Sequence, residues 1–155
     1  MALFEEEARP DNVAVAHRRL EVLSKEECLA LLAGGEIGRL VYQDADGPAA
    51  VPVNYTMVGS DIVIRVEGGI KQLAMEQPVI AFEVDAIDHE QHSGWSVLAR
   101  GVGREVDLEE VPELLQEMDG RFPTPWAEGV HGIWLRITPH TVTGRRLARQ
   151  VDAPL

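Results

Sequence analysis

The chain has 155 residues, of which 45% are hydrophobic and 26% are charged, a balance typical of one globular domain with a buried core. Its 14 basic and 26 acidic side chains give a formal net charge of −12, which disfavours nucleic-acid binding through charge alone. No apolar run approaches the roughly 20 residues that span a bilayer, the first residues lack a signal-peptide pattern, and Cys28 is the only cysteine. We therefore expect a cytoplasmic protein with no nucleic-acid or membrane partner, no disulfide and no thiolate metal site.

Residues 1–20 show no clear period and are predicted to form a loosely docked N-terminal arm. The next segment, Ser24-Lys25-Glu26-Glu27, is a capping box in which the serine hydroxyl and the second glutamate each satisfy a free backbone N–H. Leucines follow, and Gly34-Gly35 is a typical helix stop. The pattern predicts a short packing helix over residues 25–33.

Strand-like runs, separated by turn residues, occupy most of the remaining chain. They lie at residues 37–42, 50–58, 62–66, 79–85, 94–106 and 132–146, the last with an interruption at Pro139. Short helices are expected at 70–76 and 108–118. These elements predict a mainly β fold, a six-stranded antiparallel barrel with short flanking helices. The domain spans residues 21–150, between the arm at 1–20 and a tail at 151–155.

Three familiar kinds of catalytic or cofactor site are not supported. No serine lies in a Gly-x-Ser-x-Gly turn. His89 and His92 lie in a polar loop without an evident third metal ligand, so we interpret them as solvated and expect no metal. Gly101 and Gly103 lie inside a strand, whereas a dinucleotide fingerprint needs a strand-to-helix turn. These glycines instead predict a bend or a close backbone approach.

The stretch from Arg65 to Lys71 is a candidate phosphate site. Arg65 ends a predicted strand, Gly68-Gly69 frees the backbone, and Lys71 opens a short helix. Two cations and the free N–H groups of a helix start can converge on one phosphate. The alternative is a surface arginine at a strand end and a solvated lysine, and spacing alone favours this alternative.

Pro52-Val53-Asn54 and Trp95 are candidates for contact with a flat ligand. A proline within a strand cannot donate to the ladder, so Pro52 indicates an edge or an interruption of pairing. Unpaired backbone groups there could meet a planar, hydrogen-bonding ligand. A simple bulge that closes the barrel explains the proline equally well. Trp95 can cover a ring system, although core packing is the default for tryptophan.

An ordered series of segments also runs along residues 24–147. Its members are Ile37-Gly38-Arg39-Leu40, Val51-Pro52-Val53-Asn54-Tyr55, Asp61-Ile62-Val63-Ile64-Arg65 with Gly69-Ile70-Lys71, Val79-Ile80-Ala81-Phe82-Glu83-Val84-Asp85, and Gly94-Trp95-Ser96-Val97-Leu98-Ala99-Arg100-Gly101. This series resembles the pyridoxamine 5′-phosphate oxidase-like family of FMN-binding split barrels, especially its short actinobacterial and nitroimidazole-resistance-like branch.

The resemblance implies a split barrel that forms a homodimer, with two FMN molecules in clefts between the subunits. The positions that match the family's flavin contacts fall into three groups: the backbone of Pro52, Val53 and Asn54 at the isoalloxazine edge; Ile64, Arg65, Lys71 and Gln72 at the ribityl phosphate; and Trp95, Ser96 and Val97 on the strand that reaches the flavin from the other subunit.

The first functional hypothesis is an FMN-dependent oxidoreductase that exchanges electrons with a small-molecule substrate or electron donor, with no catalytic side chain that the sequence identifies. A deazaflavin is the alternative cofactor. The second hypothesis is a flavin-binding module for storage or sensing without turnover, and the third is a dimer without a cofactor. Longer family members carry a C-terminal arginine and histidine for substrate, which have no counterpart here, so pyridoxamine phosphate is not the expected substrate.

Overall fold

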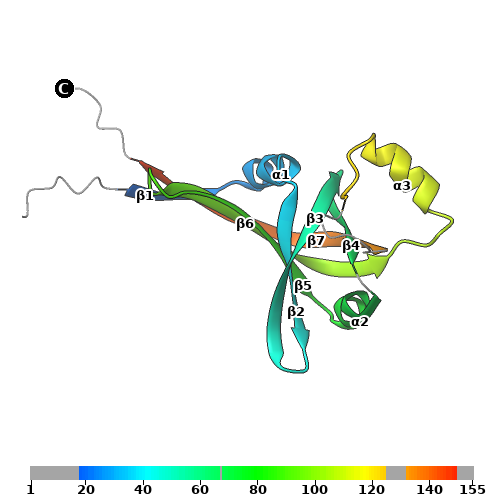
Figure 1. Cartoon of the computed structure of the whole chain (residues 1–155). Helices are drawn as coiled ribbons and strands as arrows, with labels where there is room; N and C mark the ends of the chain where they lie inside the picture. Colours follow the sequence, from blue (N-terminus) through cyan, green and yellow to red (C-terminus); the bar gives the residue numbers. More distant parts are fainter. Residues whose placement is uncertain (1–17, 67, 125–131, 150–155) are drawn as a thin grey trace, which may run out of the picture.

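The computed structural model describes residues 18–66, 68–124 and 132–149. Within these residues, seven strands and three helices are arranged as Figure 1 shows. The strands are β1 (Arg18–Leu23), β2 (Ile37–Asp44), β3 (Gly47–Val58), β4 (Asp61–Val66), β5 (Ile80–Asp88), β6 (Ser93–Glu105) and β7 (Ile133–Arg149). The helices are α1 (Lys25–Ala33), α2 (Gly68–Glu76) and α3 (Val111–Met118).

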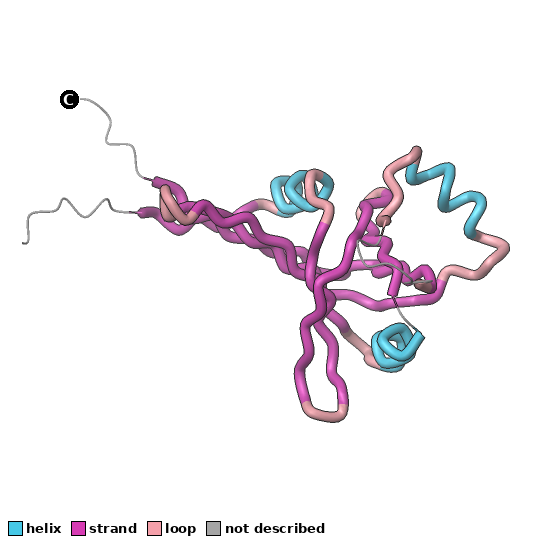
Figure 2. The backbone as a smooth tube through the Cα atoms, viewed as in Figure 1, coloured by secondary structure: helices cyan, strands magenta, loops and turns pink. Residues whose placement is uncertain are grey.

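The described strands pair in antiparallel fashion, and six of them close a barrel. The ring runs β7-β4-β3-β2-β5-β6, β6 pairs back to β7, and β1 adds to the outside of β7. β7 has 17 residues: its first part pairs with β4, its last part with β1, and most of its length with β6. The end of β5, the start of β6, the end of β7 and β1 therefore form a ribbon that projects from the barrel, as Figures 1 and 2 show.

The predicted fold class is confirmed: the chain is mainly β, with an antiparallel barrel and short flanking helices. The predicted count of six strands is wrong, because Arg18–Leu23 forms a seventh. This segment pairs along its whole length with Gly144–Arg149 of β7, a distant partner that no local pattern reports. The rest of the predicted arm, residues 1–17, and the predicted tail lie outside the described residues.

Local hydrogen bonds explain where α1 and α3 begin. In α1, the Ser24 hydroxyl accepts a hydrogen bond from the Glu27 N–H at 3.2 Å, and the Glu27 carboxylate accepts one from the Ser24 N–H at 2.8 Å, which confirms the capping box. Helix α3 begins at Val111, later than predicted, because the N–H of Glu110 donates to the carbonyl of Asp107 at 2.9 Å in a preceding turn. No helix in the described ranges is long and apolar enough to cross a bilayer.

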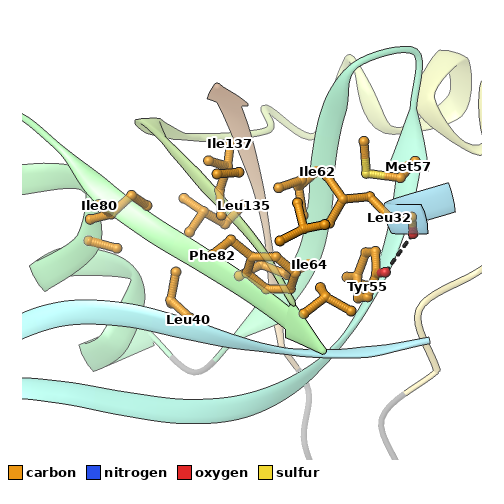
Figure 3. Packing of buried hydrophobic residues seen from close by; sticks show 14 of the residues in the cluster. Leu32, Leu40, Tyr55, Met57, Ile62, Ile64, Ile80, Phe82, Leu135 and Ile137 are labelled. Atoms are coloured by element: carbon orange, nitrogen blue, oxygen red, sulfur yellow. Dashed lines mark hydrogen bonds between the residues drawn. The ribbon is translucent and has the colours of Figure 1, made fainter. Parts of the chain in front are cut away.

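Two apolar clusters lie on opposite faces of the sheet. Ile62 and Ile64 belong to the barrel core shown in Figure 3, whereas Val63 between them belongs to a second cluster. Because side chains alternate along a strand, the clusters occupy the two faces of β4. Helix α2 closes the barrel core through Ala74, which is fully buried. Helix α3 covers the second cluster, whose other members are Val58, Val106, Leu114 and Met118.

β7 runs through Pro139 to its end at Arg149, whereas the sequence predicts an interruption at the proline. The β6–β7 register shifts between Arg100 and Gly101, and Gly101 lies opposite Pro139. A Cβ on Gly101 would lie 2.1 Å from the carbonyl oxygen of Thr138, so the predicted close backbone approach is confirmed. The bulge lets the strand continue past a residue that cannot donate to the ladder.

Candidate functional site

Strand β3 changes partner along its length. Residues 47–54 pair with β2, whereas residues 55–58 pair with β4. Within the described chain, the first part of β3 therefore has no partner strand on its second side. The N–H of Tyr55 donates to the carbonyl of Glu36 at 3.0 Å, and backbone groups alternate direction along a strand, so the backbone of Pro52 points away from β2. Pro52 thus lies at an open edge, where its missing N–H costs no ladder bond.

The end of β4 and the start of α2 border this open edge. Continuing the β3–β4 register by one residue puts Asn54 opposite Arg65. β4 ends at the residue after Arg65, and α2 follows closely along the chain. The segment predicted to meet a planar ligand (52–54) and the start of the segment predicted to hold a phosphate (65–71) are therefore neighbours in space.

Arg65 contacts a tryptophan ring and a backbone carbonyl at this border. Its guanidinium lies over the ring of Trp134, 5.0 Å from the centroid. Its Nε and Nη2 also donate long hydrogen bonds of 3.4 Å to the carbonyl oxygen of Gly132. Both partners are neutral, so they position the guanidinium without cancelling its charge. Gly132 packs closely against Arg65, since a Cβ on Gly132 would lie 3.0 Å from the Cβ of Arg65.

Lys71 already has an acidic partner. Its Nζ lies 3.0 Å from Oε2 of Glu105, and the lysine side chain is only 15% exposed. Glu105 pairs in register with the core residue Leu135, whereas Arg65 pairs with Trp134. The two cations therefore interact with opposite faces of the sheet. A phosphate in contact with both would sit beyond the end of β4, at the first turn of α2, and Lys71 would have to leave or share Glu105 to reach it.

The other predicted phosphate and strand positions differ in what they can offer. Gln72 is exposed, and its Nε2 donates to Oε1 of Glu76, one turn along α2, at 2.5 Å. Ile64 and Val97 are fully buried, and Figure 3 shows Ile64 among the core side chains. Val53 also packs against the barrel core. The side chains of Ile64 and Val97 are therefore not accessible to a ligand, whereas that of Val53 is only partly buried.

Trp95 and Ser96 lie on the projecting ribbon, where β6 pairs with both β5 and β7. They line a hollow of about 400 Å³ whose walls include Leu20, Ile87 and Leu147. In the ring of six strands, two strands separate β6 from β3 in either direction. Within one chain, the structure therefore does not bring these residues to the open edge of β3.

A cluster of charges lies beside Pro52 on the outer face of the barrel. Arg39 pairs in register with Pro52 in β3 and with Glu83 in β5. Its Nη1 lies 2.8 Å from Glu83 and 3.4 Å from Asp85. The hydrogen bond to Glu83 and the charge of Asp85 raise the pKa of Arg39. Since two carboxylates already neutralise this cation, Arg39 is not a candidate for binding a phosphate.

Two features of this region were not predicted from the sequence. One is the partner of Lys71, because Glu105 lies 34 residues away and is one of 26 acidic residues in the chain. The other is a cavity of about 390 Å³, which Asn54 lines together with the end of α1 and residues 121–124. Thr56 could have indicated this cavity from the sequence, because it is a polar residue within an apolar run. Among the described residues, Thr56 has the one buried polar side chain.

Comparison with known proteins identifies the family. The family model described as pyridoxamine 5′-phosphate oxidase matches residues 24–146. The chain belongs to the pyridoxamine 5′-phosphate oxidase family. Among curated proteins, the "Uncharacterized protein Rv0080" of Mycobacterium tuberculosis is 30% identical to it over 143 residues, which cover 88% of this chain and 91% of that protein.

Solved structures share the same barrel. The FAD binding protein from Mycobacterium smegmatis matches with a TM-score of 0.62 and 27% identity, over 84% of this chain and 100% of that one. An FAD-binding protein from Mesorhizobium loti matches with a TM-score of 0.66 and 20% identity, over 83% of this chain and 99% of that one. The resemblance to this family noted from the sequence is therefore confirmed.

Proposed function

We propose that this protein is a flavin-dependent oxidoreductase that acts on a small molecule, with FMN held between two copies of the chain. The open edge of β3 carries the proposal, because it offers backbone groups to the polar edge of a flat ring and has beside it a guanidinium with no acidic partner among the described residues. Membership of the pyridoxamine 5′-phosphate oxidase family supports a flavin, as does the similar M. smegmatis protein named for FAD binding.

The candidate residues have distinct roles in this proposal. The backbone groups of Pro52 and Asn54, which point away from β2, bind the edge of the ring and fix its orientation. Arg65 binds the phosphate together with the free N–H groups at the start of α2. Lys71 joins this contact when it exchanges Glu105 for the phosphate. The bound flavin supplies the redox chemistry, since its ring can accept and release electrons.

A homodimer is part of the proposal because Trp95 and Ser96 lie across the barrel from the open edge. If these residues cover a flavin, they cover the one bound by a second copy. The ribbon that carries them also has an apolar row suited to an interface. Leu20, Leu147 and Ile87 lie in register across the ribbon and are 57%, 37% and 63% exposed. Contiguous exposed apolar surface of this kind marks interaction sites.

The test begins with the visible spectrum of the purified protein and mass spectrometry of the ligand that it releases. Protein freed of ligand is then titrated with FMN, FAD and a deazaflavin nucleotide. We expect FMN to bind, Arg65→Gln to weaken binding about tenfold through loss of a charge-assisted contact, and Arg104→Gln, an exposed control, to leave it unchanged. Uptake of none of the three would refute the proposal, and tighter binding of FAD or the deazaflavin would correct the cofactor.

Turnover and assembly need separate measurements. Oxidation of NADH or NADPH with an added acceptor tests the oxidoreductase. A flavin that binds tightly but is never reduced would instead identify the non-catalytic binding module. Sedimentation of the loaded protein tests the dimer, and Leu20→Glu should shift it toward the monomer because a charge would be buried in the proposed interface.

A further inference from the structure

A second candidate site lies next to the open edge of β3. A cavity of about 390 Å³ is bounded by β3, by the end of α1 and by the segment that follows α3. Figure 1 shows α1 and this segment on either side of the same end of β3. Of the residues that match the family's flavin contacts, only Asn54 lines the cavity, so the cavity is adjacent to the proposed ring site but distinct from it.

Two consecutive residues of β3 hold the walls of this cavity in place. The Tyr55 hydroxyl donates to the carbonyl of Leu32 in α1 at 2.5 Å, as Figure 3 shows. Gly35 permits this approach, because a Cβ there would lie 2.2 Å from the hydroxyl oxygen. Thr56 faces the other way, and its hydroxyl donates to the carbonyl of Arg121 in the segment after α3. Both walls are therefore tied to the folded barrel.

Opposite charges line the cavity without pairing with each other. On the α1 wall, the backbone carbonyl of Glu36 accepts the hydrogen bond from the N–H of Tyr55. The carboxylate of Glu36 has no hydrogen-bond or ion-pair partner among the described residues. On the other wall, Arg121 donates from Nε to the carbonyl of Met118 at 3.1 Å, which leaves its two terminal nitrogens without a described partner. Helix α1 has no basic residue in its last turn, so its dipole adds to the negative wall.

The same cavity has apolar surface for a flat group. Phe122 lies on the wall with Arg121 and is 48% exposed, and Ala33 and Pro123 add further apolar surface. A volume of about 390 Å³ is in the range of sites for small organic ligands. Charge-assisted hydrogen bonds to a carboxylate and to a guanidinium are the strong polar contacts that such a site can offer.

We propose that this cavity binds a small aromatic molecule with a cationic amine at one end and a carboxylate at the other. Glu36 accepts hydrogen bonds from the amine, the terminal nitrogens of Arg121 donate to the carboxylate, and Phe122 packs against the ring. The further identification of this molecule as the substrate rests on the proposed function, because contact through Asn54 is what links the cavity to the open edge. The binding site itself does not depend on a flavin.

Three matched probes test the proposal by calorimetric titration of the full chain. They are 4-(aminomethyl)benzoate, which carries both charges, and benzoate and benzylamine, which carry one each. We expect the first to bind about tenfold more tightly than either of the others, since each added contact is a hydrogen bond to a charged group. Glu36→Gln should remove its advantage over benzoate, and Arg121→Gln should remove its advantage over benzylamine.

Two further variants separate binding from folding. Glu26→Gln makes the same charge change at the other end of α1, outside the cavity, and should leave all three affinities unchanged. Phe122→Ala leaves the hydrogen bonds of Tyr55 and Thr56 intact and should weaken all three probes by a similar factor. Thermal unfolding of each variant shows whether the fold is retained, and Arg121→Met, which also removes the charge, replaces Arg121→Gln if the latter unfolds.

The outcomes distinguish this inference from the proposed function. Equal affinity for the three probes, or no effect of either charge-removing variant, would refute the cavity site even in a protein that binds flavin. Preference for 4-(aminomethyl)benzoate in a protein that takes up no flavin would support the cavity site and refute the proposed function. In flavin-loaded protein, a change in the flavin absorption band on probe binding would place the substrate here, and an unchanged band would refute that part.

Discussion

Removing the carboxylate of Glu105 is expected to tighten the binding of FMN. The Nζ of Lys71 lies 3.0 Å from this carboxylate, and the pair lies close to the first turn of α2, where the phosphate is proposed to bind. The phosphate therefore competes with Glu105 for the same cation. Glu105→Gln keeps the size of the side chain but removes its charge, so Lys71 becomes available to the ligand.

The expected magnitude follows from the exposure of the pair. The Lys71 side chain is 15% exposed and that of Glu105 is 38% exposed, so solvent screens the interaction and it contributes on the order of 1 kcal/mol. Repulsion between the carboxylate and the phosphate is similar, because two charges about 4 Å apart in water interact by about 1 kcal/mol. Relief of one or both terms corresponds to a dissociation constant lower by roughly 5- to 30-fold.

The assay is quenching of FMN fluorescence on titration with ligand-free protein at low and high salt. The gain in Glu105→Gln should shrink as salt screens the charges. Glu110→Gln is the matched control, because Glu110 pairs with Arg104 at the same distance of 3.0 Å but lies at the start of α3. Binding no tighter than wild type would refute the reasoning, and weaker binding would show that Glu105 positions Lys71 for the phosphate.

Four further predictions concern the stability of the fold. Tyr55→Phe removes the 2.5 Å hydrogen bond to the carbonyl of Leu32, which keeps its second bond from the N–H of Gly35, so urea titration should show a loss of about 0.5–1.5 kcal/mol. Burial raises the pKa of Tyr55 from 10.0 to about 12, so wild-type stability should fall between these pH values as the unfolded-state tyrosine ionises first, and Tyr55→Phe should remove this part of the slope. Gly101→Ala puts a Cβ 2.1 Å from the carbonyl oxygen of Thr138 and should lower the free energy of unfolding by at least about 2 kcal/mol. Gly69→Ala, with no atom within 4 Å of the new Cβ, should change it little. Equal effects of the two variants in thermal unfolding would contradict this. Ser24→Ala removes the capping box of α1 and should cost about 1 kcal/mol, with Lys25→Ala as a control that keeps the cap; urea titration measures both.

Elements with local signals were predicted well from the sequence. The capping box and the double glycine locate α1 because both ends of that helix are satisfied by residues within a few positions of each other. β1 was missed, because it exists through pairing with the opposite end of the chain. The course of β7 through Pro139 was missed for a related reason, since the bulge that accommodates the proline depends on Gly101 in another strand.

The candidate site also combines features that single residues indicate with features that depend on distant strands. The chemistry of Pro52 and Arg65 is visible in single residues, and the structure places their segments side by side. Strand register decides what else they meet, and register is a long-range property. The register directs the side chains of Ile64 and Val97 into the core. It also places the ion pair of Lys71 and Glu105 on the opposite face of the sheet from Arg65. That Arg65 and Lys71 bind the same phosphate stays a prediction.

The register of β3 links the proposed ring site to the adjacent cavity. With Pro52 at the open edge, Tyr55 faces α1 and Thr56 faces the segment after α3, so both walls of the cavity are anchored. A slip of one residue would turn the nitrogen of Pro52 toward β2 and lose a ladder bond, and would reverse the faces of Tyr55 and Thr56. The proline therefore helps to exclude the registers one residue away on either side, in which β3 would lose its open edge and the two anchored walls. One strand can carry both the edge and the walls because the same register sets them.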